Sequence, residues 1–429
     1  MNPPQAARDD ARPEGWLLLL QTAAVFLAVS LPFALRVLPL FILLIAIATI
    51  ALRVRYGHGS WHRPTLTSAL TWMALFYLLH VLGMAWTTNT SFGAFDLEVK
   101  AAFIVFPVLW WLLPSGSVLE RSKVLRAFVW ANAGAVLICL LAATWHFGNE
   151  YYLRGQGRLP ADPAWTNHFF ESRFSQFLHP SYMAMYLSFA LAVVLLQPSD
   201  NAPRHSLLGL VPALLVLGII LCNSKMGWLT LAVVIGLAVQ GRWRDAAMRK
   251  RLLVLSGIGV VLFTALFMAF PTVSGKLTQA ISATGAIDPT SDQSSALRRM
   301  AWDAVTDLFK AQPMQGVGTG DIKDELIAVY QAKGYVHAEA KRMNAHSQFL
   351  QSAGALGISA LLVSLALVLA PLIKAFRSHH ALRMAFWLII ALNWSVESMA
   401  EVQAGVIFLA FLGWLMPQEG PTSLSLHDR

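Results

Sequence analysis

The feature that most constrains this chain is a series of long apolar segments that recurs along nearly its whole length. Residues 16–31, 252–270 and 356–373 approach or reach the roughly 20 residues that cross a hydrocarbon core about 30 Å thick. The chain has 429 residues, of which 56% are hydrophobic and 13% charged, and one water-soluble core cannot bury that much apolar surface. We therefore expect an all-α, polytopic integral membrane protein with about twelve transmembrane helices. Residues 1–429 would form a single membrane domain.

The apolar segments predict where these helices lie. The N-terminal one is preceded by Arg8 and Arg12, as in a signal peptide, but it lacks a small-residue cleavage site and another span follows. We expect it to remain as the first helix. The predicted spans are 16–32, 36–52, 65–85, 98–113, 127–147, 179–196, 207–222, 226–240, 252–270, 346–373, 384–396 and 402–416.

The positive charge is divided between alternate loops. A net charge of +9 could indicate nucleic-acid binding, but the cations gather in every second loop, which the positive-inside rule assigns to the cytoplasm. This predicts both termini in the cytoplasm and argues against a nucleic-acid partner. The cations in these loops are Arg53, Arg55, Arg63, Arg121, Lys123, Arg126, Arg242, Arg244, Arg249, Lys250, Arg251, Lys374, Arg377 and Arg383.

Two of the remaining loops are too long to be simple turns. Residues 148–178 form a smaller and 271–345 a larger loop on the opposite, periplasmic side, where function is expected to reside. Within the larger loop, residues 294–310 have apolar side chains at helical spacing and predict an amphipathic helix. A glycine-rich turn at 316–320 and a second helix at 321–333, with Asp321 at its positive end, would follow.

Four cationic or titratable side chains fall at predicted outer ends of spans or in outer loops: Arg173, Lys225, Arg298 and His346. Charges near the membrane are costly and so suggest function. Lys225 lies in a tight turn, Asn223-Ser224-Lys225, between two spans; it is either a snorkelling lysine or a cation for a phosphate. Arg298 is either solvated or grips a phosphate with its planar fork.

His346 opens the long span that follows it, with Asn344 as the expected N-cap. The helix N-terminus and the neighbouring Lys341 and Arg342 would disfavour the imidazolium, which leaves a neutral ring able to act as a general base. The alternative is a hydrogen-bonding interfacial histidine.

The other candidates are weaker. Arg173 is either an interfacial anchor or a ligand for substrate, and Arg154 and Arg158 in the same loop rank below it. Glu397 and Glu401, between the last two spans, either orient a catalytic histidine, bind acceptor hydroxyls or form a wet helix end.

Four further patterns favour structural readings over metal or cofactor sites. Asp96-Leu97-Glu98 is an acidic pair of the kind that can hold a divalent metal, but such a triplet is common by chance. The turn at 316–320 lacks the Lys-Ser/Thr of a phosphate-binding loop. His379 and His380 lie in a predicted cytoplasmic loop, away from the other candidates. Cys139 and Cys222, both in apolar runs, offer neither a disulfide framework nor a zinc site. None of these patterns predicts a metal or cofactor site.

Several motifs, taken in order, resemble the bacterial O-antigen ligase and polymerase superfamily. Arg298 stands four residues before Trp302, and Gly316-Val317-Gly318, His346-Ser347-Gln348 and Gly354 to Gly357 follow. Upstream, Arg173 with His179-Pro180-Ser181 and the turn at Lys225 are similar to further family elements. The resemblance covers residues 170–360. Lys225 stands where arginine is commoner, and Ser347 where asparagine is commoner.

This resemblance implies a GT-C-like glycosyltransferase of the inner membrane with a periplasmic active site. The expected reaction is a metal-independent, inverting transfer of O-antigen from undecaprenyl diphosphate to lipid A-core. His346 would be the catalytic base; Arg298, Lys225, Arg173, Arg154 and Glu397 would bind the diphosphate or other parts of the substrates.

Other functions remain open from sequence. An O-antigen polymerase and a protein O-oligosaccharyltransferase share the motifs. The large outer loop before His346 and the short basic C-terminus favour the ligase over the protein transferase, and the choice between ligase and polymerase is closer. A polyprenyl-glycan flippase or transporter is a different class, but transporters carry polar residues at mid-membrane in two related halves. Here the polar candidates gather at one face, which favours an enzyme.

Overall fold

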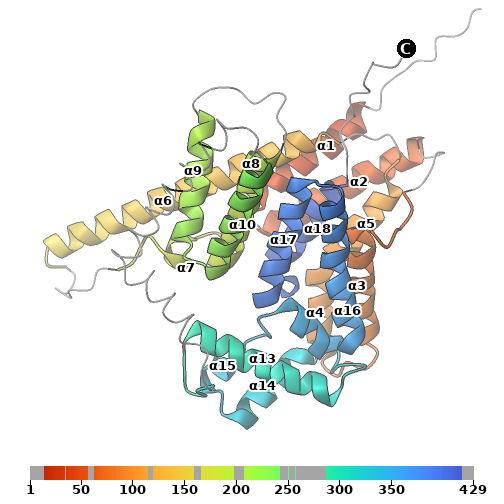
Figure 1. Ribbon diagram of the computed structural model, residues 1–429, viewed down its shortest axis with the longest axis vertical. Coiled ribbons are helices and arrows are strands. Elements are labelled where there is room, and N and C mark those ends of the chain that lie inside the picture. Colours follow the sequence, from red (N-terminus) through yellow and green to blue (C-terminus); the bar gives the residue numbers. More distant parts are fainter. Residues whose placement is uncertain are drawn as a thin grey trace, which may run out of the picture.

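Figure 1 shows a computed structural model of the chain. It describes residues 14–33, 35–56, 62–114, 119–158, 166–197, 207–241 and 287–417, with Lys250 and Gly257. The described residues are helical, with no strand. The helices are α1 (Glu14–Ser30), α2 (Leu38–Tyr56), α3 (Ala69–Gly83), α4 (Thr90–Lys100), α5 (Ala102–Leu112), α6 (Arg121–Gly155), α7 (Glu171–Phe174), α8 (Pro180–Leu196), α9 (Leu207–Leu221), α10 (Lys225–Gly241), α13 (Ser294–Ala311), α14 (Ile322–Lys333), α15 (Val336–Ala340), α16 (Gln348–Arg377), α17 (Ala381–Val396) and α18 (Gln403–Leu415), with short 3₁₀ turns η1 (Leu35–Val37) and η2 (Met399–Glu401).

The all-α fold class is confirmed for this part of the chain. Helices α2, α6 and α16 are long and apolar enough to cross a membrane, and eight shorter apolar helices accompany them. The predicted span at 252–270 lies outside the described residues, apart from Gly257. The total of about twelve spans and the GT-C relationship therefore stay predictions.

An exposed apolar face on α2 supports a lipid environment. Leu40, Leu43, Ile47, Ile50 and Val54 are spaced three or four residues apart, and each is at least 43% exposed. Transfer of such a side chain out of water is worth roughly 1.5–3 kcal/mol. A stripe of this kind is explained by contact with lipid rather than with water.

Two predicted boundaries are wrong. Helix α6 runs on to Gly155, so the first eight residues assigned to the loop 148–178 are helical. A pair one turn apart, Glu150 and Arg154, stabilises this extension, since Arg154 Nη2 donates to Glu150 Oε1 at 2.7 Å. The span predicted at 98–113 begins instead at Ala102, because residues 98–100 end a separate helix, α4.

Helix α8 lies at the centre of the bundle and is buried from Pro180 to Val193. It packs against α6, α9, α10 and α17. A Cβ on Gly227 of α10 would lie 2.7 Å from Ala184 Cβ, and one turn further along Ser188 Oγ lies 2.9 Å from Thr230 Oγ1. Both residue numbers rise together, so α8 and α10 run in the same direction and their N-termini lie at the same end.

Helices α13, α14 and α15 form a layer across one end of the bundle, which we call the loop helices (Figure 1). The two predicted helices are confirmed as α13 and α14. The predicted apolar face of α13 is buried, and Gly334 in left-handed conformation (φ +67°) ends α14. Lys333 ties the two helices together through ion pairs to Asp303 and Asp307.

The glycine motifs explain how the loop helices attach to α16. Helix α16 is interrupted at Leu356 and Gly357, where Gly357 has φ +70°. The residues before α14 replace the lost helical hydrogen bonds, because Val317 N donates to Gly354 O at 3.1 Å and Gly318 N to Ala355 O at 2.9 Å. A Cβ on Gly316 would lie 2.4 Å from the backbone of Ala355. The turn at 316–320 is thus structural in its contacts, and the helix that covers the span predicted at 346–373 is kinked.

Candidate active site

His346 lies in the loop between the loop helices and α16. Its backbone is left-handed, with φ +45°, an uncommon conformation for a residue other than glycine. The Asn344 side chain accepts a hydrogen bond from His346 N at 3.0 Å and supports this turn. The prediction that Asn344 caps α16 is wrong, because Ser347 is the N-cap and accepts from Leu350 N at 3.5 Å. The turn needs two residues after Asn344 before the helix can begin.

The spacing of Arg298 and Trp302 follows from one turn of α13. Both side chains leave the helix on the same side, where Trp302 contacts His346 and Arg298 contacts the end of α17. Trp302 Nε1 donates to the His346 carbonyl at 3.2 Å. Arg298 Nε donates to Val396 O at 3.3 Å and its Nη1 to Ser294 Oγ at 2.7 Å.

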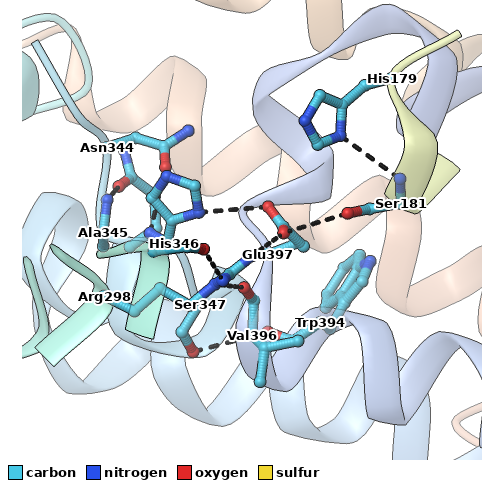
Figure 2. Close-up of polar contacts among 12 residues, drawn as sticks. His179, Ser181, Arg298, Asn344, Ala345, His346, Ser347, Trp394, Val396 and Glu397 are labelled. Carbon is cyan, nitrogen blue, oxygen red and sulfur yellow. Dashed lines mark hydrogen bonds and ion pairs between the residues drawn. The ribbon is translucent and has the colours of Figure 1, made fainter. Parts of the chain in front are cut away.

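Glu397, just beyond the end of α17, joins these groups (Figure 2). Its Oε2 lies 3.2 Å from His346 Nδ1, and its Oε1 accepts from Arg298 Nη2 at 2.5 Å and from Ser181 Oγ at 3.4 Å. The residue is 6% exposed. Four segments that are distant in sequence therefore meet at one carboxylate.

The charge on Glu397 determines how His346 is held. Burial acts to raise the pKa of this carboxyl, but the His346 hydrogen bond and the Arg298 charge together outweigh it and lower the pKa to about 2. An ionised carboxylate can only accept, so His346 Nδ1 must donate. In the neutral ring, Nε2 then carries the lone pair and is available as a base. The sequence argument considered only the helix end and nearby cations, which disfavour the imidazolium, whereas this carboxylate sets which ring nitrogen carries the proton in the neutral ring.

The His179-Pro180-Ser181 motif begins α8. His179 Nδ1 accepts from Ser181 N at 3.4 Å, and Pro180 occupies the first helical turn, where its missing N–H costs nothing. This arrangement presents Ser181 to Glu397, as Figure 2 shows. The sequence indicated the motif, but not its contact with Glu397.

Lys225 and Arg173 belong to the same end of the bundle. Lys225 is the first residue of α10, and because α8 and α10 are parallel with Gly227 beside Ala184, it lies near the level of the α8 N-terminus. The turn before it is tied to α7, which carries the exposed Arg173, because Asn223 Nδ2 donates to Glu171 Oε1 at 3.1 Å.

Arg154 lies in a different cluster, built from the end of α6 and the segment before α7. Its guanidinium binds Glu150, whose other carboxylate oxygen lies 2.6 Å from His168 Nε2. The carboxylate that holds Arg154 is therefore Glu150, whereas the one that holds Arg298 is Glu397.

Glu401 is separated from Glu397 by one short turn and has different partners. Lys100 Nζ lies 2.9 Å from Glu401 Oε1 and also pairs with Asp96, and all three groups are nearly inaccessible. Gln348 Nε2 donates to Glu401 at 3.4 Å, while its Oε1 accepts from Ala400 N at 2.7 Å. The Asp96 carboxylate is thus engaged in an ion pair. Among the described residues, no group of three or more His, Cys, Asp or Glu side chains could hold a metal.

A cavity of about 410 Å³ opens beside His346. Its wall comes from the segment before α13 and the start of that helix, and from the segment after α15. The lining residues are Asp292, Ser294, Leu297, Lys341, Arg342, Met343, Asn344 and His346.

A helical bundle with lipid-compatible faces and a carboxylate–histidine pair at one end defines the class as a membrane enzyme. Residues 210–365 match the sequence model of a family described as O-antigen ligase. This match supports the O-antigen ligase family, as the motifs indicated, and implies a glycosyltransferase-like enzyme of the ligase and polymerase kind. The match includes Lys225, Arg298 and His346 but ends before Glu397. No curated protein matches the chain.

Proposed function

We propose that this protein transfers O-antigen polysaccharide from undecaprenyl diphosphate to lipid A-core on the periplasmic face of the bacterial inner membrane. The observation that carries the proposal is the Arg298–Glu397–His346 chain of contacts, which gives a histidine with one ring nitrogen fixed and the other available. Such a pair can deprotonate a hydroxyl.

The reaction is a single displacement. His346 Nε2 takes the proton of the acceptor hydroxyl, and the hydroxyl oxygen bonds to the anomeric carbon of the donor sugar. The bond from that carbon to the diphosphate oxygen breaks, and polyprenyl diphosphate leaves with the electron pair. Attack from the face opposite the leaving group inverts the anomeric configuration, and the imidazolium then releases its proton to water.

Fixed cations stabilise the leaving diphosphate without a metal or cofactor in this scheme. Arg298 carries five N–H groups, and three of them are engaged: Nε with Val396, one on Nη1 with Ser294 and one on Nη2 with Glu397. The remaining donors bind phosphate oxygens, together with Lys225 at the head of α10 and Arg173 on α7. Lys225 acts as a point charge where an arginine would bind in bidentate fashion. Arg154, which is paired to Glu150, has a more distant role in binding the glycan.

The first test is transfer of glycan from undecaprenyl diphosphate to lipid A-core by the purified protein, with EDTA present throughout. Wild type is expected to transfer, and His346→Ala to lose at least about 100-fold in rate, as is typical for loss of a general base. His337→Ala, which removes a half-buried histidine of α15, is the matched control and should retain activity.

The outcomes separate the candidate functions. Normal turnover by His346→Ala would remove the base assignment, and loss of wild-type activity in EDTA would remove the metal-free mechanism. Chain growth on the polyprenyl carrier without transfer to lipid A-core would make the protein a polymerase. Transfer to a polypeptide would make it a protein O-oligosaccharyltransferase, and movement of the carrier glycan across the bilayer without transfer would make it a flippase.

A further inference from the structure

The cavity beside His346 has no role in the donor site described above. Its lining comes from residues 292–297, which include the start of α13, and from residues 341–346 after α15, and none comes from the apolar helices α8, α10 or α17. A polyprenyl-linked donor must approach from the lipid-facing bundle, where Lys225 and Arg173 lie. The cavity therefore lies beside the histidine among residues of the loop helices, where the group that gives up its proton to His346 can enter.

The charges of the cavity select the chemistry of that group. Lys341 and Arg342 are consecutive exposed cations on its wall, and Asp292 is the one carboxylate among the lining residues. Arg342 lies 3.8 Å from Asp324, an exposed pair of little strength that leaves most of the guanidinium available. The left-handed backbone of Arg342, with φ +46°, fixes the direction in which its side chain leaves the loop.

The polar groups of the cavity suit a sugar. Ser294 and Asn344 supply both donors and acceptors, and Asp292 accepts from hydroxyls. Leu297 and Met343 give an apolar floor against which a sugar ring can pack. A volume of about 410 Å³ lies within the range of small-molecule sites.

We propose that this cavity is the acceptor subsite and that it binds a glycan carrying phosphate or carboxylate groups, with Lys341 and Arg342 contacting the anion and His346 contacting the reactive hydroxyl. The proposal rests on the transferase function proposed above. It divides the substrates between two sides of one histidine, with the donor diphosphate on the Lys225 side and the anionic acceptor on the Lys341 side.

Direct binding provides the first test, because it does not depend on turnover. The probes are deacylated lipid A-core oligosaccharide with its phosphates and the same oligosaccharide after phosphatase treatment, titrated into the full-length protein in nanodiscs. The Lys341→Gln/Arg342→Gln double variant should bind the phosphorylated probe about tenfold more weakly, with the dephosphorylated probe bound equally by both proteins. Lys310→Gln removes an exposed cation of α13 that does not line the cavity and should leave both affinities unchanged.

Steady-state transfer provides the second test and identifies the side of the histidine. The double variant should raise KM for lipid A-core about tenfold, while kcat and KM for the polyprenyl donor stay at wild-type values. A rise in the donor KM alone, or equal weakening with both probes, would overturn the assignment. Failure of the wild type to transfer to lipid A-core would instead count against the proposed function, and the binding titration would still decide whether the cavity takes an anionic glycan.

Discussion

At the residue scale, the site is organised around a strained histidine. A non-glycine residue with positive φ costs on the order of 1–3 kcal/mol and is maintained only when its surroundings enforce it. His346 is enforced from three directions, by Asn344 on its amide, Trp302 on its carbonyl and Glu397 on its ring. Such enforcement keeps Nε2 in one place while substrates exchange.

Glu397→Gln should reduce the transfer rate by about 10- to 100-fold, because a neutral amide cannot stabilise the imidazolium that forms when His346 takes a proton.

The stability of the protein should also respond to pH through Glu397. The folded-state pKa of about 2 lies below the ordinary 4.5, so the ionised carboxylate favours the folded state above pH 4.5. This contribution is lost as the pH falls toward 2.

Thermal unfolding of the detergent-solubilised protein between pH 7 and pH 3 provides the measurement. The difference in Tm between wild type and Glu397→Gln should shrink as the pH falls. Glu325→Gln, at an exposed carboxylate of α14, should show a small and constant difference. A gap for Glu397→Gln that is the same at both pH values would contradict the linkage.

Trp302→Phe removes only the hydrogen bond to the His346 carbonyl and keeps an aromatic ring. We expect kcat to fall about tenfold with KM nearly unchanged, because the imidazole loses its fixed position but no substrate contact is removed. Trp130→Phe, on a 56% exposed tryptophan of α6, is the control and should have wild-type kinetics. A change confined to KM would mean that Trp302 contacts substrate instead.

At the element scale, the break in α16 allows the loop helices to dock. Gly357 adopts φ +70°, and a Cβ there would lie 2.5 Å from the backbone of Met314. Gly354, one turn earlier, is packed against Val305 and Ile322 of the loop helices, with a Cβ position 2.6 Å from Val305 Cγ2. These contacts set how far α13 lies from α17, and hence whether Arg298 reaches Glu397.

Gly357→Ala should destabilise the protein by at least about 2 kcal/mol and lower activity, because it combines an unfavourable φ with a backbone clash. Gly236→Ala in α10 is the matched control, because a Cβ there meets nothing within 4 Å and alanine favours a helix. Tm and transfer rate of both variants provide the test. An unchanged Tm for Gly357→Ala would show that α16 can straighten without cost.

The sequence predicted many of the described helices and named several residues that meet at Glu397, but it did not predict how the helices join. Apolar periodicity located α13 and α14, and residue type identified Arg298, His346 and Glu397 as candidates. Periodicity did not predict the break at Ala101 or the kink at Gly357, because both depend on partners distant in the chain. Lys100, beside the break, pairs with Glu401, and residues 313–318 bond to the backbone of α16 at the kink. For the same reason the partners of Glu397 could not be assigned from periodicity alone.

At the scale of the whole molecule, the fold separates a bundle that faces lipid from a layer of helices at one end. His346 lies where the two meet, and the basic residues Lys374 and Arg377 end α16, which begins beside His346. Within α16, a helix long enough to cross a membrane, the basic residues lie in the last turn, at the end away from the site, and the positive-inside rule assigns that end to the cytoplasm. This arrangement supports a site at the periplasmic surface.

Single cysteines at the two ends test that orientation. Cys139 and Cys222 are buried, so the native background is low. In cells whose outer membrane has been permeabilised, a membrane-impermeant maleimide should label Lys310→Cys on α13 at once. It should label Arg377→Cys at the far end of α16 only after the inner membrane is also opened; both positions are exposed. The reverse pattern would place His346 on the cytoplasmic side. An acceptor in the outer leaflet could not reach it there, and the proposed periplasmic transfer would be ruled out.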